Sequence, residues 1–285
     1  MPTEYAPTVR GRRLAAELRK LRENAKLTPE NAATLLGFTR PWLVKRETAM
    51  IVPTLADVEL ILGAYGGTNQ ALHFALRDIA RRIRERGWWV GYGDVLDDSY
   101  AELEDAASKI KVVQKEVVTG LLQTSDYARV LIGEFTDDPS ETDRRLQARL
   151  TRQTILQRSP APRLEVVFSE EVLRRPVGGV EVMREQLAAL VTAAEKPNVS
   201  IRIVPLSRGH YPALGQGSMS LFQFEPKVEL DTAHVETIAG SRYIEEVEEV
   251  NRCTAMFERV ASAALPRDES RDLMTLISKG EAPVP

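Results

Sequence analysis

The sequence is poor in cysteine, in histidine and in long apolar runs, and each shortage excludes a class of protein. Its 285 residues include one cysteine, Cys253, and three histidines. A single cysteine excludes an internal disulfide framework. No apolar run approaches the ~20 residues of a membrane-spanning helix, and the first residues lack the apolar stretch of a secretory signal. We therefore expect a cytoplasmic protein that does not enter a membrane.

The residue patterns of common catalytic and metal sites are also missing. None of His73, His210 and His234 lies four residues from another histidine or from Cys253, so the sequence gives little support for a zinc site. Neither a GxSxG nucleophile elbow nor a Walker A loop occurs. The His-x-Lys core of phospholipase-D-like nucleases is absent as well. We expect no metal, no cofactor and no enzymatic activity.

Charge is distributed unevenly along the chain. The formal net charge is −3, from 38 Lys and Arg against 41 Asp and Glu. In residues 1–92 the basic residues outnumber the acidic ones by 15 to 9, whereas in the remainder they are outnumbered by 32 to 23. A basic N-terminal third predicts contact with a polyanion, although chance clustering on solvated surfaces is the alternative.

The first third predicts short helices joined by tight turns. Leu14, Leu18 and Leu21 recur at the spacing of a buried helical stripe. Thr28 is a suitable N-cap for a second helix that ends at Gly37, which can adopt a positive φ. The remaining faces of the first helix carry Arg12, Arg13, Arg19, Lys20 and Arg22.

Phe38 alone separates Gly37 from the next expected cap, Thr39. So short a connection makes consecutive helices cross steeply, which is the helix-turn-helix arrangement. Leu43 is the expected inward anchor of the helix over residues 40–48. The alternative is a small helical bundle with a charged surface. A fourth helix is expected after Pro53, with its buried stripe at Leu55, Val58, Ile61 and Leu62.

We interpret the helix over residues 40–48 as one that presents its outer face to DNA, with its N-terminal residues in the major groove. Arg40 suits guanine or a phosphate, Trp42 suits a thymine methyl group or deoxyribose, and Lys45 suits a phosphate or guanine. The predicted DNA-binding residues are Thr28, Thr39, Arg40, Trp42, Lys45 and Arg46.

This stretch resembles the Xre/Cro-like helix-turn-helix family over about residues 10–66. Residues 28–36 match the second helix of the family and residues 39–47 match its recognition helix. Polar groups that contact phosphates or bases in the family are missing at Pro29 and Val44, which affects the bases that are read. The chain departs from the family at Pro29, Val44, Arg46 and Ala49, where the family often has Gln, a small polar residue, an apolar residue and Gly.

From Asp94 onward the pattern alternates between helices and strands. A strand–helix–strand pass followed by a hairpin indicates an α/β or α+β domain with a mixed sheet. We expect helices over residues 99–133, 141–158, 180–195, 241–264 and 269–279, and strands over 164–168, 199–206, 218–224 and 227–237.

The chain is therefore predicted to be a multi-domain protein. An all-α helix-turn-helix domain over residues 8–68 is followed by a basic connector helix and an aromatic linker over 69–93. An α/β (α+β) domain over residues 94–280 is expected to serve regulation, dimerisation and partner binding.

The C-terminal part carries a second resemblance. The segments YAELEDAAS (100–108), TGLLQTSDYARVL (119–131) and NVSIRIVPLSRGH (198–210) occur in this order in actinobacterial regulators of the WhiJ type. The GLLQT segment is the most specific of these marks, although Thr119 stands where the family commonly has Pro. The resemblance implies a transcriptional regulator, usually a repressor, whose second domain has unknown biochemistry. It also implies a small partner protein encoded nearby, in pairs that are sometimes described as antitoxin-like.

The segment over residues 207–218 follows a predicted buried strand. Ligands often bind at the carboxyl ends of such strands. Arg208, His210 and Tyr211 are therefore the candidate ligand-binding residues, and an ordinary glycine-rich turn is the alternative.

Taken together, these patterns predict a DNA-binding transcriptional regulator, and the resemblance to the WhiJ type implies a repressor. Its C-terminal domain would form a homodimer and receive a signal from a small protein or a ligand. A twofold dimer predicts a near-palindromic operator in double-stranded DNA. Two alternatives stay open: an antitoxin-like interaction protein with autoregulatory DNA binding, and an enzyme in the C-terminal domain.

Overall fold

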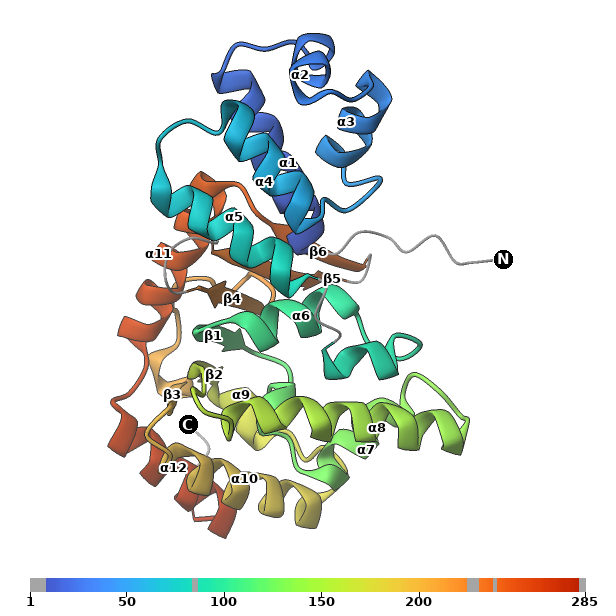
Figure 1. Cartoon of the computed structure of the whole chain (residues 1–285). Helices are drawn as coiled ribbons and strands as arrows, with labels where there is room; N and C mark the ends of the chain where they lie inside the picture. Colours follow the sequence, from blue (N-terminus) through green and yellow to red (C-terminus); the bar gives the residue numbers. More distant parts are fainter. Residues whose placement is uncertain (1–8, 84–86, 225–230, 238–239, 282–285) are drawn as a thin grey trace. The chain divides into compact units, whose positions relative to one another are not determined.

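The structure is a computed structural model, in which the described residues divide into two compact units (Figure 1). The described residues are 9–83, 87–224, 231–237 and 240–281. The first unit holds residues 9–83, 87–90 and 97–103, and the second unit holds the other described residues.

The first unit is built from short helices with well-formed ends. The Thr28 hydroxyl accepts a hydrogen bond from the backbone N–H of Asn31, and Gly37 ends the same helix with φ 76°. Thr54 and Asp57 form a capping box at the start of a later helix. Residues 84–86 of the expected connector helix lie outside the described residues. The helices are α1 (Val9–Asn24), α2 (Pro29–Leu36), α3 (Arg40–Glu47), α4 (Leu55–Tyr65) and α5 (Gln70–Arg82).

One apolar cluster holds these helices together. The predicted stripe of α1, Leu14, Leu18 and Leu21, is buried, and it packs with Leu43 of α3 and Ile61 of α4. Burial of one such side chain contributes about 1.5–3 kcal/mol. An isolated helix as short as α3, with eight residues, is not stable in water. Its conformation therefore depends on this packing.

The second unit contains a mixed six-stranded sheet, which confirms the expected fold class. The strand order is β3-β2-β1-β4-β5-β6. The first three strands of the chain run parallel to one another, and the hairpin strands that follow pair antiparallel. The strands are β1 (Lys109–Gln114), β2 (Arg163–Ser169), β3 (Val199–Val204), β4 (Met219–Gln223), β5 (Thr232–Thr237) and β6 (Gly240–Ile244).

Two of the predicted helices are wrong in part. The helix expected over residues 99–133 is interrupted by β1, a central strand of the sheet. The helix expected over 241–264 begins only at Val247, because the residues before it form β6. Residues 227–230 of the last expected strand lie outside the described residues.

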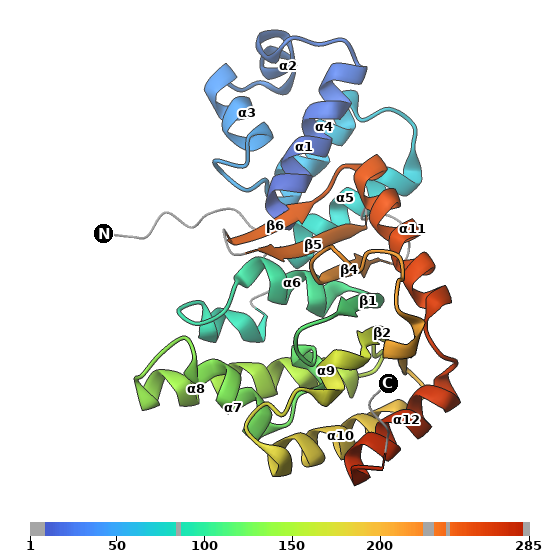
Figure 2. The ribbon, with the colours of Figure 1, turned by 180° about the vertical axis from the view of Figure 1, so that it is seen from behind.

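Helices flank the sheet of the second unit. α11 contacts β1, β3 and β5, and its Phe257 belongs to an apolar cluster with Val113 of β1 and Leu221 of β4. α10 and α12 pack against each other and against β3, and they lie side by side in Figure 2. The helices of this unit are α7 (Ser125–Gly133), α8 (Pro139–Gln153), α9 (Glu170–Arg174), α10 (Val180–Ala194), α11 (Val247–Ala263) and α12 (Arg267–Lys279), with short 3-10 turns at Gly120–Leu122, Thr154–Leu156 and Leu206–Arg208. The chain passes from one unit to the other within α6 (Asp98–Ala106) and within a 3-10 turn at Trp88–Tyr92.

A buried amide fixes the GLLQT segment. The side chain of Gln186 in α10 is fully buried. Its Oε1 accepts from the N–H of Thr124 at 2.7 Å, and its Nε2 donates to the carbonyl of Leu122 at 2.8 Å. The hydroxyl of Thr124 accepts a hydrogen bond from the N–H of Tyr127 and so caps α7. These contacts give the segment a structural role in joining α7 to α10.

Candidate nucleic-acid interface

A connection of three residues, Gly37, Phe38 and Thr39, joins α2 to α3. The N–H of Phe38 donates to the carbonyl of Ala33 at 2.9 Å, which closes the turn around Gly37. Thr39 occupies the N-cap position of α3 in an extended conformation, but its hydroxyl makes no capping hydrogen bond. Pro41 in the first turn removes one of the N–H groups that a cap would satisfy. The exposed Thr39 side chain is therefore not used to hold the helix.

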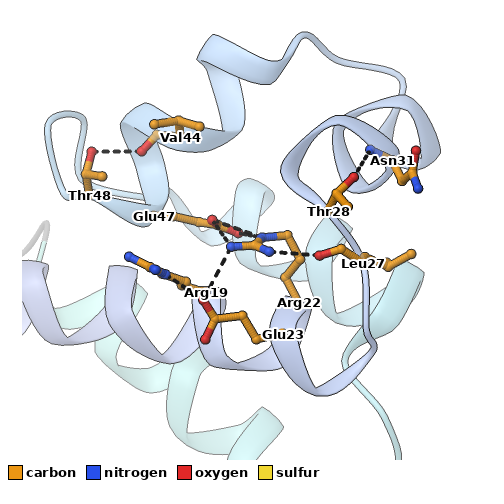
Figure 3. A network of polar contacts seen from close by, with 9 residues as sticks. All are labelled: Arg19, Arg22, Glu23, Leu27, Thr28, Asn31, Val44, Glu47 and Thr48. Carbon is orange, nitrogen blue, oxygen red and sulfur yellow. Dashed lines mark hydrogen bonds and ion pairs between the residues drawn. The ribbon is translucent and has the colours of Figure 1, made fainter.

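A buried ion pair fixes the other end of α3 (Figure 3). Arg22 of α1 donates from Nε to Oε1 of Glu47 at 2.8 Å and from Nη2 to Oε2 at 3.0 Å. Its Nη1 also donates to the carbonyl of Leu27 at 2.8 Å. The hydrogen bond with Glu47 is the main reason why the pKa of Arg22 is raised. Arg22, which the sequence places outside the leucine stripe of α1, is thus buried together with Glu47.

Trp42 and Arg46 are partly buried, so the structure does not place them on the outward face where they were expected. The Nε of Arg46 lies 2.9 Å from Oδ2 of Asp57, with the two side chains 14% and 11% exposed. The guanidinium carbon of Arg46 lies 4.0 Å from the centroid of the Trp42 ring. Trp42 itself packs against the helical core. Arg46 thus ties α3 to α4, with its charge compensated within the protein, and Trp42 is held against the helical core.

Arg40 and Lys45 are exposed cations of α3. The Arg40 side chain is 60% exposed, and its Nε lies 2.6 Å from Oε1 of Glu30. Exposed ion pairs of this kind contribute only about 0–1 kcal/mol, so a DNA phosphate or base can replace Glu30 as the partner. Lys45 is exposed as well. Of the six predicted DNA-binding residues, the structure brings Thr28, Thr39, Arg40 and Lys45 to exposed positions.

An aromatic ring in the turn before α3 was not among the predicted residues. Phe38 is 45% exposed and stacks on Trp42, with ring centroids 4.0 Å apart and an interplanar angle of 18°. An exposed apolar ring can contact a thymine methyl group or a deoxyribose. Its place between the end of one helix and the cap of the next was the signal in the sequence that could have identified Phe38.

The structure separates the three candidate ligand-binding residues of the second unit. Arg208 and His210 are exposed, whereas Tyr211 is 5% exposed and belongs to the apolar cluster beneath α11. Burial raises the pKa of the Tyr211 hydroxyl. Lys115 donates to two carbonyls of the loop over residues 207–218, so it anchors that loop at the end of β1. The expectation that Tyr211 is available to a ligand is wrong, because its ring fills the core.

Two features are absent from the described part of the chain. Across the described residues, no group of three or more His, Cys, Asp or Glu side chains is placed to hold a metal ion. Within the same part of the chain, no helix is both long and apolar enough to cross a membrane.

Comparison with known proteins agrees with the two units. Residues 13–74 match a helix-turn-helix domain. This range contains the turn between α2 and α3 and the two exposed cations of α3, Arg40 and Lys45. Residues 97–275 match a domain of unknown function, DUF5753. No curated protein and no solved structure matches the chain. The DUF5753 match spans more than half of the sequence, and the chain is therefore a member of the DUF5753 family that carries a DNA-binding helix-turn-helix domain ahead of it.

Proposed function

We propose that this chain is a sequence-specific transcriptional repressor of the actinobacterial WhiJ type, acting on the nucleoid in the cytoplasm. The observation that carries the proposal is the presentation of α3. The helix is anchored through Leu43 and the Arg22–Glu47 pair, while Arg40 and Lys45 remain exposed. A short helix held in this way suits insertion into the major groove.

Each exposed residue of α2 and α3 has a distinct role in the proposal. Arg40 exchanges Glu30 for the O6 and N7 atoms of a guanine, which a guanidinium binds in a bidentate manner. Lys45 neutralises a phosphate, and the hydroxyls of Thr28 and Thr39 donate to phosphate oxygens. Trp42 and Arg46 take no direct part, since their contacts hold α3 in place.

The DUF5753 domain serves dimerisation in this proposal. A twofold dimer presents two copies of α3 separated by about 34 Å, which is one turn of the double helix. The operator is then near-palindromic, and its half-site spacing reports the dimer geometry.

Selection of duplexes from a random pool by the full chain tests this function. Enrichment of a near-palindromic sequence, with half-sites about 10 base pairs apart from centre to centre, is the expected result. Uniform retention of all sequences, or no retention at low salt, would refute a sequence-specific regulator.

The proposal also includes binding of a small partner protein by the second unit, from which the chain receives its signal. The antitoxin-like alternative includes the same binding. Phe135, which follows α7, is 82% exposed, and we propose it as a contact of the second unit with a small partner protein. A small partner that co-purifies with the full chain, and is lost from Phe135→Ser, would place the interface there. A stable complex whose DNA binding controls only its own operon would favour the antitoxin-like function.

We assign no catalytic activity to the chain. A screen of the full chain against hydrolase and nucleotide-transfer substrates checks this part of the proposal. Turnover that follows the protein through purification would show that the second unit is an enzyme.

A further inference from the structure

A cavity of about 280 Å³ lies where α9, α10 and α12 meet in the second unit. Most of its wall is apolar and comes from Leu173, Pro176, Met183, Leu187 and Ile277. We infer that this cavity is a binding site for a small, uncharged, apolar molecule. The inference deepens the proposed function, on which it rests for its biological meaning, by naming the ligand class of the second unit.

The polar groups around the cavity determine the charge of the ligand. Arg174 donates to the buried Glu170 at 2.6 Å, and the Arg184–Glu181 pair is closed at 2.6 Å on the surface. The hydroxyl of Ser278 donates to a backbone carbonyl at 2.8 Å. Arg174 is thus neutralised by the buried carboxylate of its own helix, whereas Arg184 and Glu181 are solvent-exposed, with side chains 53% and 79% exposed. A charged group placed against the apolar wall of the cavity would leave water without gaining a compensating partner there, which is unfavourable.

The dimensions of the cavity determine the size of the ligand. Its volume lies just below the range of about 300–1,000 Å³ that is common for small-molecule sites. Ten residues line it, whereas a standard protein interface uses about 20–30 residues on each side. A compact molecule of two or three aromatic or aliphatic rings therefore fits it better than a folded partner does. Met183 adds a flexible, polarisable wall that adapts to different apolar shapes.

Two dyes with the same aromatic skeleton test the inference on the full chain without DNA. N-phenyl-1-naphthylamine is uncharged and fluoresces in apolar surroundings, and 1-anilinonaphthalene-8-sulfonate adds a sulfonate to the same skeleton. We expect saturable binding of one uncharged dye per chain, and binding of the sulfonate that is weaker by about tenfold or more. Failure of the uncharged dye to saturate, or tighter binding of the sulfonate, would overturn the inference.

Filling the cavity locates the dye. Ile277→Trp places a large ring in the wall and should weaken binding of the uncharged dye by about tenfold or more. Leu276→Trp is the matched control, because Leu276 is the adjacent residue, is 42% exposed and does not line the cavity. Met183→Phe fills the opposite wall and replaces Ile277→Trp if circular dichroism shows that the latter does not fold. Equal affinity of the filled variant and the control would show that the dye binds elsewhere.

Operator binding in the absence of dye tests the proposed function separately. A chain that binds the uncharged dye but no DNA would refute the regulator and support the cavity site. A chain that binds its operator but not the uncharged dye would support the regulator and refute the cavity site.

Discussion

Arg22 and Glu47 join α1 to the last residue of α3 through two parallel hydrogen bonds, and their side chains are only 7% and 5% exposed. The pair is built from residues that lie 25 positions apart in the chain. Because both charges are buried, either one becomes costly when its partner is removed. The orientation of α3 is therefore tied to this pair.

Glu47→Ala should lower the free energy of unfolding of the first unit by about 3–5 kcal/mol, because it leaves Arg22 charged and buried without a partner. All three tryptophans, Trp42, Trp88 and Trp89, lie in the sequence up to residue 89, so intrinsic fluorescence during urea unfolding reports on this region. Lys20→Ala, which breaks an exposed pair with Glu17 on α1, is the control and should change the value by less than about 1 kcal/mol. Equal effects of the two substitutions would contradict the structural role of the pair.

Tyr65 should make the first unit sensitive to alkaline pH. Burial, together with the charge of Glu47, raises the pKa of its hydroxyl to about 12. Because the unfolded chain ionises this group at its ordinary value near 10, the contribution of the neutral hydroxyl is complete below pH 10 and is lost as the pH rises towards 12. Urea titrations at pH 9 and 11 measure this loss. Tyr65→Phe should reduce it, and an unchanged pH dependence in that variant would assign the effect to other groups.

Lys26 follows α1 in the left-handed conformation, with φ 57°, and is exposed. A residue with a Cβ atom is strained there by roughly 1–2 kcal/mol, and glycine is not. Lys26→Gly should therefore raise the free energy of unfolding of the first unit by up to about 1 kcal/mol, which is measured as a higher midpoint in urea. Lys26→Ala controls for the lost charge and should leave the midpoint near that of the wild type. A lower midpoint for the glycine variant would show that the conformation is not strained.

Gln186 should be essential to the second unit. Gln186→Leu leaves the N–H of Thr124 and the carbonyl of Leu122 without their partners, at a cost of about 1–3 kcal/mol for each buried group. Thermal unfolding followed by circular dichroism measures the effect. Glu185→Leu, at the exposed neighbouring position, is the control and should change the midpoint little. A Gln186→Leu variant as stable as this control would show that the amide contacts contribute nothing.

The helical unit was largely predictable because its signals are local. Thr28 and Gly37 mark the ends of α2 within nine residues, and the leucines of α1 lie within two turns of one another. The burial of Arg22 was not predictable in this way. Its partner Glu47 is distant in the sequence, and an arginine beside other basic residues has the pattern of a solvated surface.

The central strand β1 escaped prediction for a similar reason. Its sequence, KIKVVQ, is short and half polar, so its pattern merges with that of the helices on either side. Lys111 is nevertheless only 5% exposed, because Glu258 of α11, 147 residues further on, supplies its partner. Whether such residues are buried depends on contacts with distant parts of the chain, such as the pair between Lys111 and Glu258. A local sequence pattern carries no information about these contacts.

The central claim is that the exposed face of α3 reads DNA, and a titration of the selected operator by Arg40→Ala and Lys45→Ala tests it most directly. Loss of a bidentate base contact at Arg40 should cost about 1–3 kcal/mol and relax the base preference at one position. Lys45→Ala should weaken binding to all sequences and reduce the salt slope by about 1. Arg129→Ala, which removes an exposed arginine from the second unit, should bind like the wild type. If Arg40→Ala and Lys45→Ala also bind like the wild type, with the same salt dependence, α3 does not read DNA.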